Sequence, residues 1–202
     1  MAVDILGRFD HDYQRLNMIK LPQFRELRKH RNILVLDTET ADGIKIRTLA
    51  QIGYILESPS GEVLSSMDEY VYGAKKIVWK DSKLEMQKIK QGLPPEFVRD
   101  RLNKVLRTYN PIVVAHNVFF DVPILQKIGV YFLNHEIFCT CRDPFIKNIL
   151  KLPYKGSKNR FKAPKQEELA KFCGQTWNDL TLHTAYDDVV LLTRILRHPI
   201  FF

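Results

Sequence analysis

The chain has 202 residues, a length typical of one domain with a sizeable core. With 45% hydrophobic and 27% charged residues it has the composition of an ordinary soluble protein, and no segment approaches transmembrane length. The net charge of +8 favours polyanionic partners such as nucleic acids, although a basic protein without such a partner would have the same composition.

Residues 1–31 are expected to form a helical extension ahead of a main domain that covers residues 32–202. The apolar residues Phe9, Tyr13 and Leu16 have the spacing of a short amphipathic helix, and Pro22 can start a second helix. Acidic residues in this segment argue against a transit peptide, and it contains no apolar signal-peptide region. We expect the extension to pack on the core, with a role as a partner-docking arm as the alternative.

A buried central strand that ends in two acids is predicted at residues 33–39, which are rich in leucine and β-branched residues. Alternate residues of a strand share a face, so Asp37 and Glu39 should stand side by side. Two neighbouring carboxylates repel each other and are costly to bury. A divalent cation removes that cost, and hard oxygen ligands suit Mg²⁺ or Mn²⁺. The alternative is a strand that simply ends in a polar turn.

A second strand is predicted at residues 111–116, followed by a helix over residues 117–129. This order places Asp121 in the first helical turn, where an acid also interacts favourably with the helix dipole. Pro123 cannot donate a hydrogen bond to the preceding turn, so the helix should start late or bend near that position.

The C-terminal helix is predicted to begin after His183 and to run to about residue 197. Thr184 is the expected N-cap, and Asp187, three residues later, is the expected capping-box partner. On this interpretation Asp187 has a structural role and Asp188 is available as a metal ligand.

Three motifs together resemble those of the DEDDh family of 3′→5′ exonucleases, which includes proofreading and ribonuclease-T-type domains. They are Asp37-Thr38-Glu39-Thr40, the segment from His116 through Asn117 to Asp121, and the segment from His183 to Asp188. The resemblance covers about residues 32–198. It implies an α/β fold of the ribonuclease-H-like type, with a mixed five-stranded sheet flanked by helices and its second strand antiparallel to its neighbours. The position four residues before the last acid is Thr184 rather than tyrosine, as in the histidine subclass.

The resemblance also implies a reaction and a set of site residues. Asp37, Glu39, Asp121 and Asp188 would hold two Mg²⁺ or Mn²⁺ ions, and His183 would be the general base. Hydrolysis of the terminal phosphodiester of DNA or RNA would release a 5′-mononucleotide. Further substrate contacts are expected from Thr38, Thr40, Asn117, Phe120 and Ile89. Ile89 belongs to Gln87-Lys88-Ile89, the nearest match to a family element that lies close to the substrate's 3′ end.

Residues 151–166 contain six lysines and arginines and no acid. Prolines, a glycine and a serine predict a loop here, and two aromatic side chains are available to stack on bases. Lys155, Lys158 and Arg160 are therefore candidate substrate-binding residues. The alternative is a solvated connector.

The other predicted elements are strands near residues 50–57, 62–72 and 137–140, and helices near 95–109, 142–150 and 165–173. Cys139, Cys141 and Cys173 are expected to be free thiols in a reducing compartment, such as the cytoplasm or nucleus. A zinc site with His135 is the alternative, although the spacing matches no standard zinc pattern.

Three functions follow from these observations. The first is an exonuclease that acts on a nucleic acid with a free 3′ end. The second is a nucleic-acid-binding module that has lost catalysis. The third is an editing subunit that is active only within a polymerase complex, which would dock through the extension. The sequence does not separate DNA from RNA and does not indicate an oligomeric state.

Overall fold

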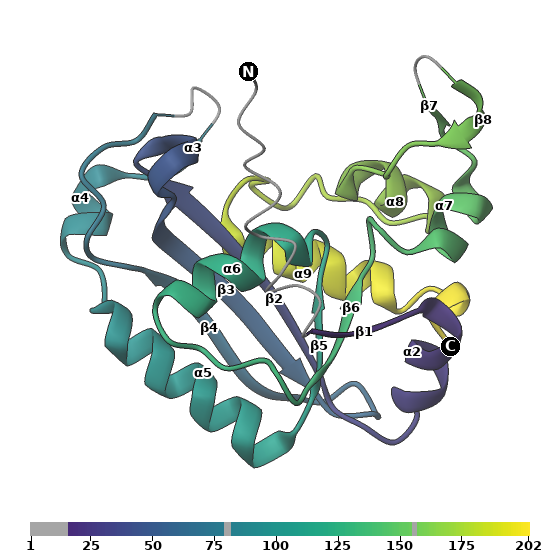
Figure 1. Cartoon of the computed structure of the whole chain (residues 1–202), viewed down its shortest axis with the longest axis horizontal. Coiled ribbons are helices and arrows are strands. Elements are labelled where there is room, and N and C mark those ends of the chain that lie inside the picture. Colours follow the sequence, from purple (N-terminus) through teal and green to yellow (C-terminus); the bar gives the residue numbers. More distant parts are fainter. Residues whose placement is uncertain (1–15, 79–81, 155–156) are drawn as a thin grey trace.

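The computed structural model describes residues 16–78, 82–154 and 157–202, with the side chains of residues 157–159 excepted. Phe9, Tyr13, Lys155 and the side chain of Lys158 therefore lie outside the described residues. Within them, a six-stranded sheet with the strand order β1-β6-β5-β2-β3-β4 forms the centre of the fold (Figure 1). The strands are β1 (Asn17–Ile19), β2 (Ile33–Ala41), β3 (Thr48–Glu57), β4 (Val63–Tyr70), β5 (Ile112–Ala115) and β6 (Glu136–Cys139).

The sheet is mixed, as predicted. β2, β5, β6 and β1 run parallel to one another, whereas β3 is antiparallel to both β2 and β4. The expected number of five strands was wrong, because β1 adds a sixth at the edge beside β6. Three residues are too few to show the alternation of a strand, and β1 exists through its pairing with a partner more than one hundred residues away.

Residues 16–31 pack on the core of the sheet. Leu16, Ile19 and Phe24 are buried, and the ring of Phe24 stacks on Phe138 of β6 with 4.3 Å between centroids. Pro22 lies in the first turn of α2 (Leu21–Leu27), as predicted. A separate domain over residues 1–31 stays a prediction.

Helices cover both faces of the sheet (Figure 1). α5 (Pro95–Tyr109) and α6 (Val118–Lys127) pack on the face that carries Leu34 and Leu36, whereas α8 (Gln166–Phe172) and α9 (Ala185–Leu196) pack on the face that carries Ile33 and Val35. The alternation along residues 33–36 of β2 therefore assigns each of these residues to one helical layer.

α6 begins at Val118 and passes through Pro123, so the helix does not start late, whereas a bend near Pro123 stays a prediction. Val118, Val122 and Leu125 are fully buried against the sheet, and this packing compensates for the hydrogen bond that proline cannot donate.

Smaller elements surround this core. They are α3 (Gly43–Ile46), α4 (Met86–Lys90), α7 (Pro144–Leu150) and the 3₁₀ helix η1 (Pro199–Phe201). Part of the segment that was predicted as a loop forms a two-stranded hairpin, β7 (Pro153–Tyr154) and β8 (Ser157–Phe161), which projects beside α7 and α8 (Figure 1). In the described part of the chain, none of the helices has the length and apolar character needed to cross a bilayer.

Candidate active site

Three carboxylates meet where β2 and the start of α9 face each other. One oxygen from each of Asp37, Glu39 and Asp188 can be chosen so that all three lie within 4.8 Å of one another. Asp37 and Glu39 follow Ile33 and Val35 at intervals of two, so they point to the face that α9 covers. Asp188 is the fourth residue of α9. The strand therefore supplies two acids, and the helix that packs on it supplies the third.

A glycine in β3 allows α9 to come this close. Gly53 pairs with Asp37, and a Cβ on it would lie 2.5 Å from the carbonyl oxygen of Ala185 and 2.6 Å from the backbone nitrogen of Tyr186. Gln51 holds the start of α9 in this position, because its side-chain oxygen accepts a hydrogen bond from the backbone N–H of Ala185 at 3.3 Å. Neither residue was among the predicted site residues. A glycine inside a strand, however, is a recognisable sign of close backbone approach.

Asp121 reaches the same region from the opposite helical layer. It is buried in the first turns of α6, and its Oδ1 accepts hydrogen bonds from the backbone N–H of Thr38 at 2.9 Å and from the Thr38 hydroxyl at 2.8 Å. Thr38 shares the face of Leu34 and Leu36, so its side chain points toward α6 while its neighbours Asp37 and Glu39 point toward α9. Thr38 thus holds Asp121 beside the other three acids.

Burial raises the pKa of all four carboxyl groups, and repulsion from other acids of the site adds to this effect for Asp37, Glu39 and Asp121. Burial has the largest effect in each case and raises the pKa of Glu39 to about 8, that of Asp121 to about 7 and that of Asp188 to about 6. The pKa of Asp37 lies well above its usual value, through burial and then through the charges of Asp121, Asp188 and Glu39. This crowding of negative charge is the condition that a bound divalent cation relieves.

The raised pKa values link this site to stability. The carboxyl groups bind their protons more tightly in the folded chain than in the unfolded chain. Below their ordinary pKa values of 3.8 to 4.5 they are protonated in both states, and they then do not reduce the free energy of unfolding. As the pH rises from there to about 8, the folded state must ionise them at a cost that the unfolded state does not have. Stability in the absence of a cation should therefore fall across this range.

His183 lies in the loop just before α9. Its side chain is exposed, its backbone has a φ of +69°, and its backbone N–H donates to Oδ2 of Asp188 at 3.1 Å. Thr184 occupies the N-cap position, but the predicted capping box does not form. Instead, Asp187 accepts a hydrogen bond from the backbone N–H of Thr181 at 2.9 Å, which gives Asp187 a structural role through a different partner.

His116, at the end of β5, has a different environment. Its Nδ1 lies 2.9 Å from the Thr140 hydroxyl, and its Nε2 lies 3.0 Å from the carbonyl oxygen of Pro164. Burial lowers the pKa of His116 to about 4, so this ring is neutral at physiological pH. Both ring nitrogens have protein partners, which makes His116 a structural link between β5 and the segment ahead of α8.

The other predicted substrate contacts are distributed unevenly. Thr38 and Thr40 are buried, and Asn117, at the N-cap of α6, accepts a weak hydrogen bond from Cys141. Phe120 is half-buried beneath the guanidinium of Arg47, which lies 5.3 Å from the ring centroid.

Two more of the predicted substrate contacts are Ile89 and Arg160, which belong to smaller elements outside the carboxylate cluster. Ile89 on α4 is fully buried in a small apolar cluster, so a contact with a substrate would require this helix to move. Arg160 is exposed on β8 of the hairpin, and the side chains of Lys155 and Lys158 lie outside the described residues.

The three cysteines are free and buried. The sulfur atoms of Cys139 and Cys141 lie 3.9 Å apart, and neither sulfur belongs to a group of zinc-ligand type among the described residues. Among the described residues the three cysteines form no disulfide bond with one another.

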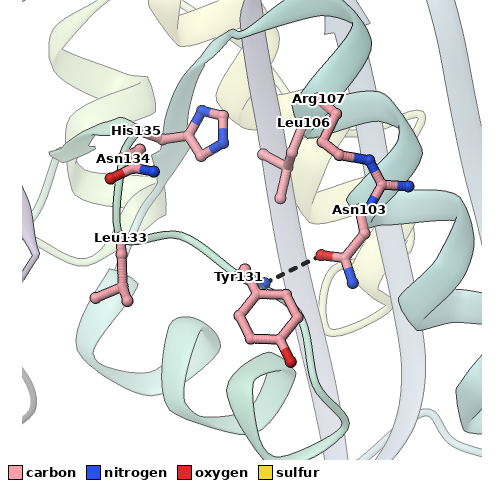
Figure 2. Close-up of a pocket in the computed structure, with 7 residues that line it drawn as sticks. All are labelled: Asn103, Leu106, Arg107, Tyr131, Leu133, Asn134 and His135. Atoms are coloured by element: carbon pink, nitrogen blue, oxygen red, sulfur yellow. Dashed lines mark hydrogen bonds between the residues drawn. The ribbon is translucent and has the colours of Figure 1, made fainter.

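Two hollows have volumes in the range of a small ligand. One, of about 330 Å³, adjoins the carboxylates and is lined by His183 and Asp188 among others. The second, of about 320 Å³, lies between α5 and the loop of residues 131–135, and Figure 2 shows Tyr131, Leu133 and His135 around it. None of the residues predicted to take part in catalysis, metal binding or substrate binding at the exonuclease site lines the second hollow, although His135, the alternative zinc ligand, does.

Comparison with known proteins places this chain in a known fold. No family model matches the sequence, and no curated protein matches it. Solved structures do match. A structure of exonuclease I has a TM-score of 0.63 at 14% identity and covers 85% of this chain. The fold is ribonuclease-H-like.

Two further structures of E. coli exonuclease I contain oligonucleotides. The complex with a 5cy-dA13 oligonucleotide has a TM-score of 0.61 at 14% identity and covers 85% of this chain. The complex with a dT13 oligonucleotide has a TM-score of 0.60 at 14% identity and covers 83% of it. In these three matches this chain spans only 41% to 42% of the exonuclease I chain.

Proposed function

We propose that this chain is a metal-dependent exonuclease that removes nucleotides from the 3′ end of a nucleic acid and releases 5′-mononucleotides. The observation that carries the proposal is the convergence of Asp37, Glu39, Asp121 and Asp188, from β2 and from helices on both of its faces, next to His183. The fold shared with exonuclease I, whose E. coli form has been solved with bound oligonucleotides, supports it further.

The four carboxylates fit two Mg²⁺ or Mn²⁺ ions. They offer hard oxygen donors only, and burial raises the pKa of each one, so their ionised form needs positive charge nearby. Asp37, Glu39 and Asp188 would hold the ions, with Asp121 contributing directly or through water. Ions bound there supply Lewis-acid stabilisation of the reacting phosphate and lower the pKa of water.

His183 supplies the base. A neutral imidazole accepts a proton near pH 7, and an exposed side chain beside Asp188 can reach a water molecule at the carboxylate cluster. The backbone N–H of His183 is bonded to Asp188, so the residue keeps a defined distance from the acids while its ring stays accessible. His116 is not suited to this role, because both of its ring nitrogens already have protein partners.

The presence of all four acids together with His183 favours catalysis over a silent nucleic-acid-binding module. The net charge of +8 favours a polyanionic substrate, and we assign part of its binding to Arg160, which is exposed on β8, together with Lys155 and Lys158. We retain an editing subunit that needs a polymerase as the alternative form of the same activity. A partner that docks through residues 1–31 belongs to that alternative.

The test is product analysis with 5′-labelled DNA and RNA oligomers, in Mg²⁺ and in chelator, for the parent and for Asp188→Ala. We expect a ladder that shortens one nucleotide at a time from the 3′ end and disappears in chelator and in the variant. Internal cuts, or a variant preparation that degrades the oligomers at the parental rate, would contradict the proposal. Activity that appears only on addition of a polymerase would favour the editing subunit.

A further inference from the structure

The hollow beside the carboxylates continues past them toward α8. Its volume is about 330 Å³, and the residues that line it include His183 and Asp188 together with Lys165, Gln166 and Glu167. It therefore adjoins the place where the scissile phosphate would be bound and has room for a further part of the substrate.

Lys165 is the lysine in the wall of this hollow. Its side chain is exposed, and among the described residues it forms no ion pair, whereas nearby Lys162 is paired with Glu168 at 2.5 Å. His116 also lines the hollow but is neutral, because burial lowers its pKa to about 4. The side chain of Lys165 is thus the cationic group that the hollow offers to an anion.

The backbone on either side of Lys165 is held by hydrogen bonds to Asp188 and His116. The side-chain amide of Gln166 donates to the carbonyl oxygen of Asp188 at 2.6 Å. The carbonyl oxygen of Pro164 is bonded to the ring of His116, and the backbone N–H of Lys165 donates to Glu168 at 2.8 Å. These bonds hold the backbone of Lys165 at a fixed place relative to Asp188.

We infer that Lys165 binds the phosphodiester on the 5′ side of the scissile one, which makes a polynucleotide rather than a single-phosphate ester the preferred substrate of this site. The inference rests on the proposed function. The terminal nucleotide contributes only the scissile phosphate, and the four carboxylates with their ions would hold that group. Any other phosphate that reaches the hollow must come from the upstream strand. A lysine binds such a phosphate as a point charge.

Glu167 and Asp188 carry negative charge in the same hollow, so Lys165 alone does not make it attractive to an anion. Divalent ions held by the four carboxylates would supply the missing positive charge. Binding of the upstream phosphate at Lys165 is therefore expected to depend on the ions.

The test compares two substrates of the same enzyme in Mg²⁺. One is a single-stranded oligonucleotide, and the other is the p-nitrophenyl ester of thymidine 5′-monophosphate, which has one phosphate. We expect Lys165→Ala to lower kcat/KM for the oligonucleotide by about 10-fold or more, to lower it much less for the ester, and to reduce the salt dependence by about one counterion. Lys165→Arg should restore most of the loss. The matched control is Lys171→Ala, which removes an exposed lysine near the end of α8. Its kcat/KM and salt dependence should equal those of the parent.

The other possible results distinguish a failure of the inference about Lys165 from a failure of the proposed function. Parental kinetics for Lys165→Ala on both substrates would overturn the inference, because the lysine would then contact neither phosphate. Equal losses on the two substrates would also overturn it, because they would place Lys165 at the scissile phosphate. A parent enzyme that cleaves neither substrate in Mg²⁺ or Mn²⁺ would instead contradict the proposed function. Melting temperatures of all variants confirm that each one is folded.

Discussion

Replacing Gly53 by alanine should separate the two halves of the candidate site. The added Cβ would lie 2.5 Å from the carbonyl oxygen of Ala185, whereas ordinary contacts begin at 3.4 Å. The atoms it meets are backbone, so no side chain can rotate away, and the start of α9 must retreat by about 1 Å. Overpacking of this kind costs about 1–3 kcal/mol of folding free energy.

The same displacement moves Asp188, one helical turn away from Ala185, relative to Asp37 and Glu39. A misplacement of about 1 Å in a catalytic group costs about 10²-fold in rate. We therefore expect Gly53→Ala to lower the urea unfolding midpoint, to weaken Mn²⁺ binding and to reduce turnover of an oligonucleotide by about that factor.

Gly61→Ala is the control for the stability change. Gly61 lies in the turn between β3 and β4 with a φ of +85° and no atom within 4 Å of an added Cβ. The strained backbone should cost about 1–3 kcal/mol without moving α9. Urea unfolding and Mn²⁺ titration compare the two variants. A Gly53→Ala protein with parental stability and parental Mn²⁺ affinity would refute the packing argument.

The remaining predictions concern pH, the base and the hairpin. Because ionising the four carboxyl groups costs the folded state more as pH rises, the increase in Tm that Mn²⁺ causes should be larger at pH 8 than at pH 5.5; an equal increase at both values would place the ions elsewhere. His183→Ala should lower turnover by about 10²–10⁴-fold and leave the calorimetric Mn²⁺ affinity unchanged, and His183→Gln should be nearly as inactive. The triple variant Lys155→Ala/Lys158→Ala/Arg160→Ala should weaken oligonucleotide binding and flatten its salt dependence by up to about one counterion per lost phosphate contact, with little change in turnover at saturation; an unchanged salt slope would mean that the segment is a connector.

Sequence patterns predicted the parts of the candidate site that depend only on the strand or helix in which each residue lies. Alternation along residues 33–39 is enough to put Asp37 and Glu39 on one face, because a strand imposes that period wherever it lies in the fold. The helix starts near Asp121 and Asp188 were predicted for a similar reason, since their turn residues and apolar spacing are local signals. These elements then meet as the resemblance to an exonuclease fold implied.

Features that depend on distant partners were missed. β1 has three residues and is a strand only because it pairs with β6, and the hairpin of β7 and β8 lies in a segment whose prolines and glycine favoured a loop. Pro123 is accepted inside α6 because the helix is buried, which a local rule cannot weigh. Thr184 and Asp187 fit the capping-box pattern, yet the side chain of Asp187 bonds to Thr181 instead.

The roles of Gly53, Gln51 and Gln166 likewise follow from contacts between elements. Gly53 and Gln51 lie on β3 and meet the backbone of α9, and Gln166 bonds to the carbonyl oxygen of Asp188. A strand glycine signals close approach, but the sequence does not tell which element approaches.

We propose that the four carboxylates form one divalent-metal site. Calorimetric titration of the parent chain with Mn²⁺ measures this binding directly. Asp37→Asn and Asp188→Asn keep the size of the side chain and remove one negative charge each from the cluster. We expect two ions per parent chain, and a loss or strong weakening of binding in both variants. Absence of binding by the parent, or the same stoichiometry and affinity in the parent and both variants, would contradict it.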